Sequence, residues 1–273
     1  MDGPGRGLRD TFRLLSDGRI EDFQAREVIS LTQVVEDPQT ASDHVSTLKT
    51  LYDPRGIDDG AQTIEDSVSL ITAMSKLGYS KVITTPHIMS DYYKNTPKII
   101  LSGLDKVKEA LYKAGISIDI EAAAEYNLEP EFEEIIKSKQ VLSFGGSEKY
   151  VLFELSFFNE PSRIKEIIWD LTNDGFQPVL AHVERYAYWH KKWDKIEDMV
   201  NRNVKLQLNI GSITGAYGPE VRNMAIKLID QGLIDFIGSD CHNPRHLEMI
   251  RHASVDPYFH RLCQQPQLLN KTL

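Results

Sequence analysis

Short apolar segments that each end in one histidine or one acidic residue recur along most of this chain. They end at His87, Glu125, Glu154, His182 and Asp240, and amphipathic, helix-like segments separate them. Strand and helix units of about 30 residues require parallel strands joined by right-handed crossovers. The carboxyl ends of such strands meet at one face of a barrel. We therefore expect these side chains to converge on a single site.

The same alternation predicts an α/β fold, a distorted, TIM-like (β/α) barrel of about seven strands. A doubly wound sheet fits less well, because the candidate ligands come from nearly every strand end and must meet at one axis. A first strand is expected just before Gly56. The other strands are predicted at 81–85, 118–123, 150–155, 178–181, 205–210 and 236–239, and the helices at 63–77, 97–114, 130–139, 162–174, 192–203 and 219–231.

The first 47 residues differ from the rest of the chain. They are polar and mixed in charge, and they contain no strand that ends in a candidate ligand. We interpret residues 1–47 as an extension without an assigned role, with helical pieces or partial disorder as the alternatives. Residues 48–273 are interpreted as one barrel domain.

Composition restricts the class of protein. The chain has 31 Lys and Arg against 40 Asp and Glu, a formal net charge of -9, which argues against a generally basic surface for nucleic acid. Its two cysteines, Cys241 and Cys263, make no disulfide framework and favour a reducing compartment. The basic amino terminus lacks the apolar core of a signal peptide, and no segment is long and apolar enough to span a bilayer. We expect a cytoplasmic protein without membrane insertion.

Asp240 and His242 form an Asp-x-His motif at the end of a predicted strand. Alternate residues of an extended chain share a face, so the two side chains can reach one point beyond the strand. Any one of the candidate ligands could be a satisfied core residue, but their repetition at strand ends favours a metal centre. Mixed imidazole and carboxylate ligands suit manganese, iron or zinc. Cys241, between the two ligands, is predicted to point away and pack in the core.

Three residues on the predicted rim are candidates for binding a phosphorylated substrate. Arg185 follows His182 by three residues and could grip a phosphate with its planar guanidinium. The alternative is a salt bridge from Arg185 to Glu184 or Glu160. Tyr92, together with its neighbours Asp91 and Tyr93 in the segment after His87, could line a pocket for an aromatic phosphoester. Arg245 is a second phosphate candidate.

The motifs GIDDGA, TTPHIMSDYY, AAAEYNL, VLFELSF, AHVERYAYW and IGSDCHNP occur in this order between Gly56 and Asn243. In sequence and spacing they resemble the tyrosine-protein phosphatases of the PHP (polymerase and histidinol phosphatase) superfamily. That family comprises manganese-dependent enzymes of capsule and exopolysaccharide operons. The resemblance covers more than two thirds of the chain.

The resemblance implies a distorted barrel, a trinuclear Mn²⁺ site, with Fe, Co or Zn as alternatives, and hydrolysis of phosphotyrosine on a bacterial tyrosine kinase. It also implies a tendency to form homo-oligomers. On the family pattern, Asp59, His87 and His242 bind one metal, and Glu125 bridges from a second metal to a third. Together with the rim candidates, the assigned residues are Asp59, His87, Glu125, Glu154, His182, Asp240 and His242 for metals, His182, Arg185 and Asp240 for catalysis, and Tyr92, Arg185 and Arg245 for substrate.

The chain departs from the family pattern at the first strand. The family has Asp-x-His-x-His immediately before the GIDDG turn, whereas this chain has Leu48, Thr50 and Tyr52 in those positions. His44 could take part only if several residues were skipped. Because the loss is confined to this segment, we expect residues before about Asp53 to come from another source, such as a fusion or a misassigned start. Two bound metals in place of three, and a slower enzyme, are the expected consequences.

Two alternatives to a tyrosine phosphatase stay open at this point. One is a catalytically silent protein that keeps the barrel and only binds phosphorylated partners. The other is a histidinol-phosphate phosphatase of the same superfamily. The similarity of TTPHIMSDYY and HVERY to the tyrosine-specific branch argues against the second alternative.

Overall fold

The computed structural model describes residues 27–28, 60–61 and 63–273, and within them the strands alternate with helices as the sequence predicts. Each predicted strand from residue 81 onward is confirmed to within one residue at either end. The strands are β1 (Glu27–Val28), β2 (Lys81–Thr84), β3 (His87–Ile88), β4 (Asp119–Ala122), β5 (Glu125–Asn127), β6 (Tyr150–Glu154), β7 (Gln177–Leu180), β8 (Lys205–Asn209) and β9 (Phe236–Gly238).

The predicted helices are confirmed as well, and Thr63 and Thr96 cap the first two of them. Thr63 precedes the first of them, and its hydroxyl accepts a hydrogen bond from the Asp66 amide at 3.0 Å. Sequence analysis did not anticipate α8, α10 and α11. The helices are α3 (Ile64–Lys76), α4 (Pro97–Lys113), α5 (Pro130–Lys137), α6 (Ile164–Asn173), α7 (Trp193–Asn201), α8 (Ile210–Thr214), α9 (Pro219–Asp230), α10 (Pro244–Ala253) and α11 (Pro257–Cys263), with short 3-10 turns η1 (Gly146–Glu148), η2 (Val183–Arg185), η3 (Ala187–Trp189) and η4 (Leu269–Thr272).

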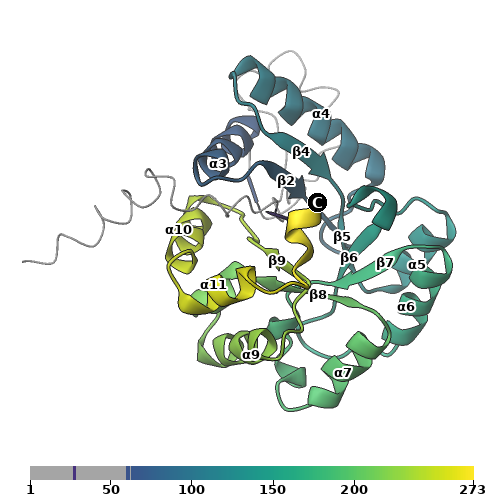
Figure 1. Ribbon diagram of the computed structural model, residues 1–273. Helices are drawn as coiled ribbons and strands as arrows, with labels where there is room; N and C mark the ends of the chain where they lie inside the picture. Colours follow the sequence, from purple (N-terminus) through teal and green to yellow (C-terminus); the bar gives the residue numbers. More distant parts are fainter. Residues whose placement is uncertain (1–26, 29–59, 62) are drawn as a thin grey trace, which may run out of the picture.

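All described strand pairs are parallel, in the orders β1-β2-β4 and β3-β5-β6-β7-β8-β9. The two groups are continuous, because the Ala123 amide donates to the Thr84 carbonyl at 2.8 Å and the Glu125 amide donates to the Pro86 carbonyl at 3.0 Å. β1 also contacts β9, at the other end of this order. The result is an α/β fold with a curled, parallel, half-barrel sheet, and helices surround it on the outside (Figure 1).

Apolar side chains fill the inside of the curl. They form a cluster separate from the larger core between the sheet and the helices. Only a curled sheet brings inward-facing residues of β2, β6, β7 and β9 into one cluster. Its buried members are Ile83, Ala123, Phe144, Tyr150, Leu152, Val179, Ala181, Phe236 and Leu273.

The C-terminal residues lie across the amino ends of the strands, at the centre of the view in Figure 1. The Asn270 side chain accepts from the Ile237 amide at 2.8 Å and donates to the Ile237 carbonyl at 2.9 Å, so it satisfies the backbone of β9 as a neighbouring strand would. The Lys81 ammonium donates to the Leu273 backbone oxygen at 2.9 Å. These C-terminal contacts cover the amino ends of the strands. They do not cover the carboxyl ends, where the candidate ligands are expected.

β1 differs from expectation. Its residues, 27–28, lie in the segment interpreted as an extension, and their backbone pairs with Val82 and Ile83 of β2. The strand expected just before Gly56, including positions 48, 50 and 52, lies outside the described residues, as does Asp59.

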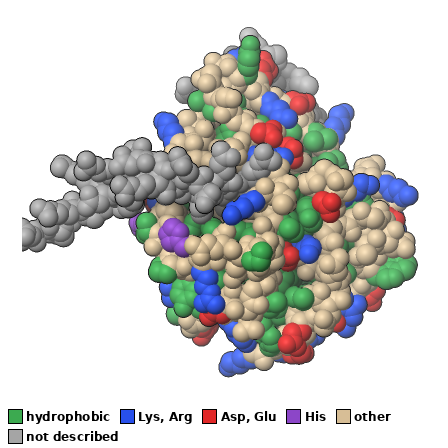
Figure 2. Space-filling view, viewed as in Figure 1, with side chains coloured by type: hydrophobic (Ala, Val, Ile, Leu, Met, Phe, Trp, Pro, Cys, Tyr) green, Lys and Arg blue, Asp and Glu red, His purple; other side chains and the backbone are tan. Residues whose placement is uncertain are grey.

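The face that carries the C-terminal residues has a mixed surface. Lys and Arg side chains are interspersed with Asp and Glu over the elements visible in Figure 2. None of the helices described between residues 63 and 273 combines the length and the hydropathy that a membrane crossing requires.

We predict that Asn270→Ala destabilises the protein by about 2–4 kcal/mol, because two buried backbone groups of Ile237 would lose their partner. Urea unfolding followed by circular dichroism measures the change. The control is Thr272→Ala, an exposed position in the same turn, which is expected to change stability by less than about 0.5 kcal/mol. Equal effects of the two substitutions would show that Asn270 does not act as the edge partner of β9.

Candidate metal centre

Four candidate ligands meet at the carboxyl ends of neighbouring strands. One ligand atom from each of His87, Glu125 and Glu154 lies within 4.8 Å of the others. The Nε2 atom of His182 lies 3.0 Å from Oε1 of Glu125 and 3.5 Å from Oε2 of Glu154. Both glutamates and His182 are buried. The sequence-based prediction that these strand ends converge is therefore confirmed for these four residues.

Breaks in the strands aim these side chains. Pro86, which has no amide hydrogen, separates β2 from β3 and puts His87 at the start of a new short strand. His182 and Asp240 both adopt left-handed backbone conformations, with φ of 32° and 49°. Such conformations are strained for residues other than glycine and persist where surrounding contacts hold them. For His182 one such contact is its amide, which donates to Oε1 of Gln207 at 2.6 Å.

Asp240 and His242, which follow β9, are further candidate ligands, and they are not part of the group formed by His87, Glu125 and Glu154. The Nδ1 atom of His242 lies 2.7 Å from the Asp240 carbonyl, which can only accept, so Nδ1 is the donor. Oδ2 of Asp240 accepts hydrogen bonds from three neighbours. The donors are Asn209 Nδ2 at 2.7 Å, Tyr217 Oη at 3.3 Å and Arg185 Nη1 at 3.4 Å. Cys241, between the two ligands, is fully buried in the hydrophobic core, as predicted.

Three buried groups, His182, Glu154 and Asp240, have pKa values shifted toward their charged forms. Burial acts to lower the pKa of His182, but its hydrogen bonds to Glu125 and Glu154 outweigh this effect and raise that pKa to about 9. Burial acts to raise the pKa of Glu154, and the contact with His182 and the charges of His87 and Arg185 leave it below the usual value. In Asp240 the positive charges of His242, His182 and Arg185 similarly exceed burial and lower the pKa.

A buried polar network supports the ligands, and sequence analysis missed it. Nε2 of Gln207 donates to Oδ1 of Asn209 at 2.9 Å, which joins the backbone of His182 to the carboxylate of Asp240. Oε1 of Glu184 accepts from the Asn209 amide at 3.0 Å and from the Ser212 hydroxyl, and burial raises the pKa of Glu184. Gln207 and Asn209 alternate along the inner face at the end of β8, a pattern that the strand-end argument could have identified.

Arg185 is the cation closest to Asp240, on the turn η2 that follows His182. The alternative pairings considered from the sequence are wrong. Glu160 pairs with Lys195 at 2.7 Å, and Oε1 of Glu184 accepts the two hydrogen bonds already described. Arg185 instead forms an ion pair with Asp240, so its positive charge lies at the candidate metal centre.

The other rim candidates lie farther out. Tyr92 is 64% exposed, whereas the neighbouring Tyr93 stacks on the His87 ring with centroids 5.4 Å apart. Arg245 is exposed on the first turn of α10, and within the described residues no hydrogen bond or ion pair joins its guanidinium to the cluster. The structure therefore brings Tyr93 to the ligands and leaves Tyr92 and Arg245 at the periphery.

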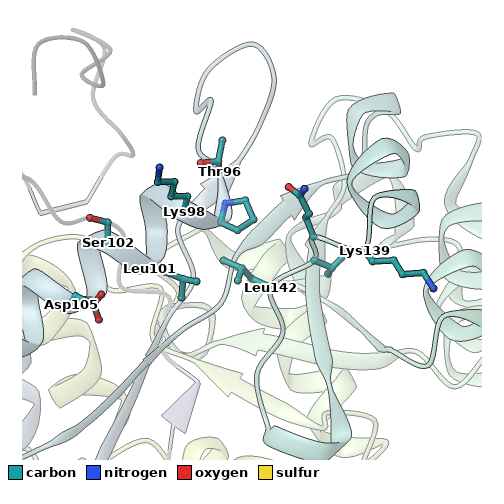
Figure 3. A pocket seen from close by; sticks show the side chains of 10 residues that line it. Thr96, Lys98, Leu101, Ser102, Asp105, Lys139 and Leu142 are labelled. Atoms are coloured by element: carbon teal, nitrogen blue, oxygen red, sulfur yellow. The ribbon is translucent and has the colours of Figure 1, made fainter. Parts of the chain in front are cut away.

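A separate cavity of about 860 Å³ lies between α4 and the segment after α5. Figure 3 shows Leu101 and Leu142 on its two walls, with polar and charged side chains around them. It shares no residue with the ligand cluster. Because the perturbed acids and imidazoles gather at the strand ends and not in this cavity, we take the strand ends as the functional site.

The residues present fit a divalent cation. Three ligand atoms from different strands lie within 4.8 Å of one another, and they are the carboxylates and imidazole that manganese, iron and zinc accept. Within the described part of the chain, Nδ1 of His182 is buried without a hydrogen-bond partner. Because Nε2 of His182 faces Glu125 and Glu154, a cation held with these two residues would contact the ring through Nε2 and not through Nδ1.

The raised pKa of His182 predicts a pH-dependent stability for the chelator-treated protein. Its contribution is complete below the unfolded value near 6.5 and is lost as the pH rises through about 9. We expect the free energy of unfolding to fall across this range by up to about 3 kcal/mol, since one pKa unit corresponds to about 1.4 kcal/mol. Urea titrations at several pH values test this. His182→Gln should flatten the profile, and the exposed control His252→Gln should keep it; a flat profile in the unmodified protein would contradict the assignment.

The sequence model of the CpsB/CapC family, described as capsular polysaccharide synthesis, matches residues 54–253. Tyrosine-protein phosphatase YwqE of Bacillus subtilis (strain 168) is 29% identical over 187 residues, which cover 68% of this chain and 73% of YwqE. The putative tyrosine-protein phosphatase CapC of Staphylococcus aureus is 24% identical over 187 residues, with the same shares covered.

A solved structure is similar as well. The crystal structures of YwqE from Bacillus subtilis and CpsB from Streptococcus pneumoniae, unique metal-dependent tyrosine phosphatases, include a chain that superposes with a TM-score of 0.68 and 26% identity. The superposition covers 76% of this chain and 85% of that chain. The family model matches well over half of the present sequence. This chain therefore belongs to the CpsB/CapC family of capsular polysaccharide synthesis.

Proposed function

We propose that this protein is a metal-dependent phosphatase that hydrolyses phosphotyrosine in proteins, with a bacterial tyrosine kinase of polysaccharide synthesis as its substrate. The observation that carries the proposal is the buried group of His87, Glu125, Glu154 and His182 with the Arg185 guanidinium beside it. The phosphatase names of the similar proteins YwqE and CapC support it. Each feature alone is compatible with other hydrolases, and their combination favours this one.

The metal-holding residues in this proposal are Asp59, His87, Glu125, Glu154, His182, Asp240 and His242. Mn²⁺ is the proposed ion, with Fe, Co or Zn as alternatives that the same ligands accept. When bound, the metal would supply Lewis-acid stabilisation of the charge on the phosphoryl group.

The chain's own side chains would bind and orient the substrate. The Arg185 guanidinium, with its fork of N–H donors, would hold phosphoryl oxygens next to the cluster. Asp240 orients Arg185 through their ion pair, and Asn209 orients Asp240. Tyr93, stacked on His87, would border the phenyl ring of the substrate, with Tyr92 and Arg245 contacting the protein around it.

We propose further that the curled sheet belongs to a barrel of about seven strands and that the first strand of this barrel is altered. Residues 48–273 would form the barrel domain and residues 1–47 an extension, although β1 lies within that extension. The sequence has Leu48, Thr50 and Tyr52 where the family pattern has an aspartate and two histidines. Homo-oligomer formation stays a prediction.

We predict that the purified protein with added Mn²⁺ releases phosphate from a phosphotyrosine peptide, and that His182→Ala lowers kcat by at least about 100-fold. Loss of a residue that only supports a metal ligand already lowers activity by about 10- to 100-fold, and His182 is proposed to hold the metal directly. Phosphate release measured by a colorimetric assay tests this. The exposed histidine variant His260→Ala on α11 is the control and should keep full activity. Activity that persists after chelation and in His182→Ala would contradict the proposal, and phosphopeptide binding without turnover would favour the silent binding protein.

We predict that the protein binds about two metal ions, because Thr50 and Tyr52 cannot replace two imidazole ligands. Elemental analysis of the metal-loaded protein gives the number. Substituting Leu48→Asp, Thr50→His and Tyr52→His together should add a third ion and raise phosphotyrosine hydrolysis. Three ions in the unmodified protein, with no gain in the triple variant, would show that other residues complete the site.

A further inference from the structure

The Arg185 guanidinium lies over two aromatic rings at once. Its Cζ atom is 4.6 Å from the centroid of Phe157 and 4.5 Å from the centroid of Tyr217. The rings come from different parts of the chain, Phe157 from the loop after β6 and Tyr217 from the turn after α8. At these distances the negative face of each ring attracts the cation.

This arrangement fixes the guanidinium without occupying its donors. The face of an aromatic ring attracts positive charge but accepts no strong hydrogen bond, so the N–H groups stay available. Within the described part of the chain, the bond from Nη1 to Asp240, at 3.4 Å, is the one side-chain hydrogen bond that Arg185 donates. The Arg185 side chain is 26% exposed, so its remaining N–H donors can reach a bound anion.

Phe157 is partly exposed although it contacts the site. Its side chain is 43% exposed, and its ring stacks on the His182 ring with centroids 5.3 Å apart. Its neighbour Phe158 on the same loop is 95% exposed. Phe157 also stacks on the buried Tyr186 at 5.8 Å, but neither Phe157 nor Phe158 is a member of the hydrophobic core clusters, so contacts with His182 and Arg185 are a large part of what holds Phe157.

We propose that Phe157 and Tyr217 are positioning residues that clamp Arg185, holding its guanidinium so that the unused N–H donors face the phosphoryl oxygens of the substrate. This inference rests on the proposed phosphatase function. Without the rings, a long arginine side chain would sample several rotamers and lose conformational entropy on each binding event. The clamp removes that loss before the anion arrives.

The test uses the full-length, Mn²⁺-supplemented protein and two readouts, the affinity for inorganic phosphate by isothermal titration calorimetry and the kinetics with a phosphotyrosine peptide. Phe157→Leu should weaken phosphate binding and raise KM by about tenfold, since loss of a partly desolvated cation–π contact is of that order. Metal content should not change. The matched control, Phe158→Leu on the same loop, should leave both readouts unchanged, and Phe157→Tyr should restore most of the affinity.

A double-mutant cycle separates the clamp from a general packing effect. In an Arg185→Ala background, Phe157→Leu should have no further effect on kcat/KM, because the residue through which it acts is absent. An effect of the same size in both backgrounds, or equal effects of Phe157→Leu and Phe158→Leu, would overturn the clamp.

The two proposals can fail separately. A protein that hydrolyses phosphotyrosine but is insensitive to Phe157→Leu retains its function and loses the clamp. A protein that binds phosphate through Arg185 and Phe157 without turnover retains the clamp and loses the proposed function. A protein that neither hydrolyses phosphotyrosine nor binds inorganic phosphate would overturn both.

Discussion

The structure depends on keeping several carboxylates buried in one place. Glu125, Glu154 and Asp240 lie at the carboxyl end of the sheet with little access to water, and an unpaired buried carboxylate is strongly unfavourable. In the protein alone, His182 and Arg185 supply the positive charge, which is why the His182 imidazole is held protonated well above its ordinary pKa. A bound divalent metal would take over this role and displace the proton. The buried carboxylates need a positive charge beside them in the metal-free protein, and the same need makes the site suitable for a divalent cation.

The curl of the sheet makes this concentration of charge attainable. Parallel strands whose inner side chains fill one apolar cluster must all end at the same height, so the polar residues after them meet above that cluster. The Asn270 side chain and the C-terminal turn cover the opposite end. The apolar cluster therefore fills the inside of the sheet, and the charged residues lie at the carboxyl ends of its strands. His182 and Asp240, with their strained backbone, lie where these two regions meet.

The sequence predicts the ligands well because each depends only on its own strand. An apolar strand that ends in histidine or glutamate carries the whole signal for Glu154 or His182 locally. Residues that act through distant partners have no such signal. Phe157 and Tyr217 reach Arg185 from loops whose course the sequence does not define, and the choice of Tyr93 over Tyr92 depends on which face of a short bridged loop turns toward His87. The helix α10 was not predicted although its start carries a local signal, the Asn243 cap followed by Pro244.

Two buried hydroxyls lie on the strands that flank β1. Thr85, which follows β2, and Ser239, which follows β9, are buried, and within the described residues neither hydroxyl has a hydrogen-bond partner. A buried hydroxyl without a partner is unfavourable by about 1–3 kcal/mol. Both lie within two residues of a candidate ligand, His87 or Asp240. The two unsatisfied hydroxyls therefore lie on the strands next to β1, close to these two candidate ligands. The candidate ligands from β5, β6 and β7 lie away from that edge, and the contacts of His182 with Glu125 and Glu154 involve neither β2 nor β9.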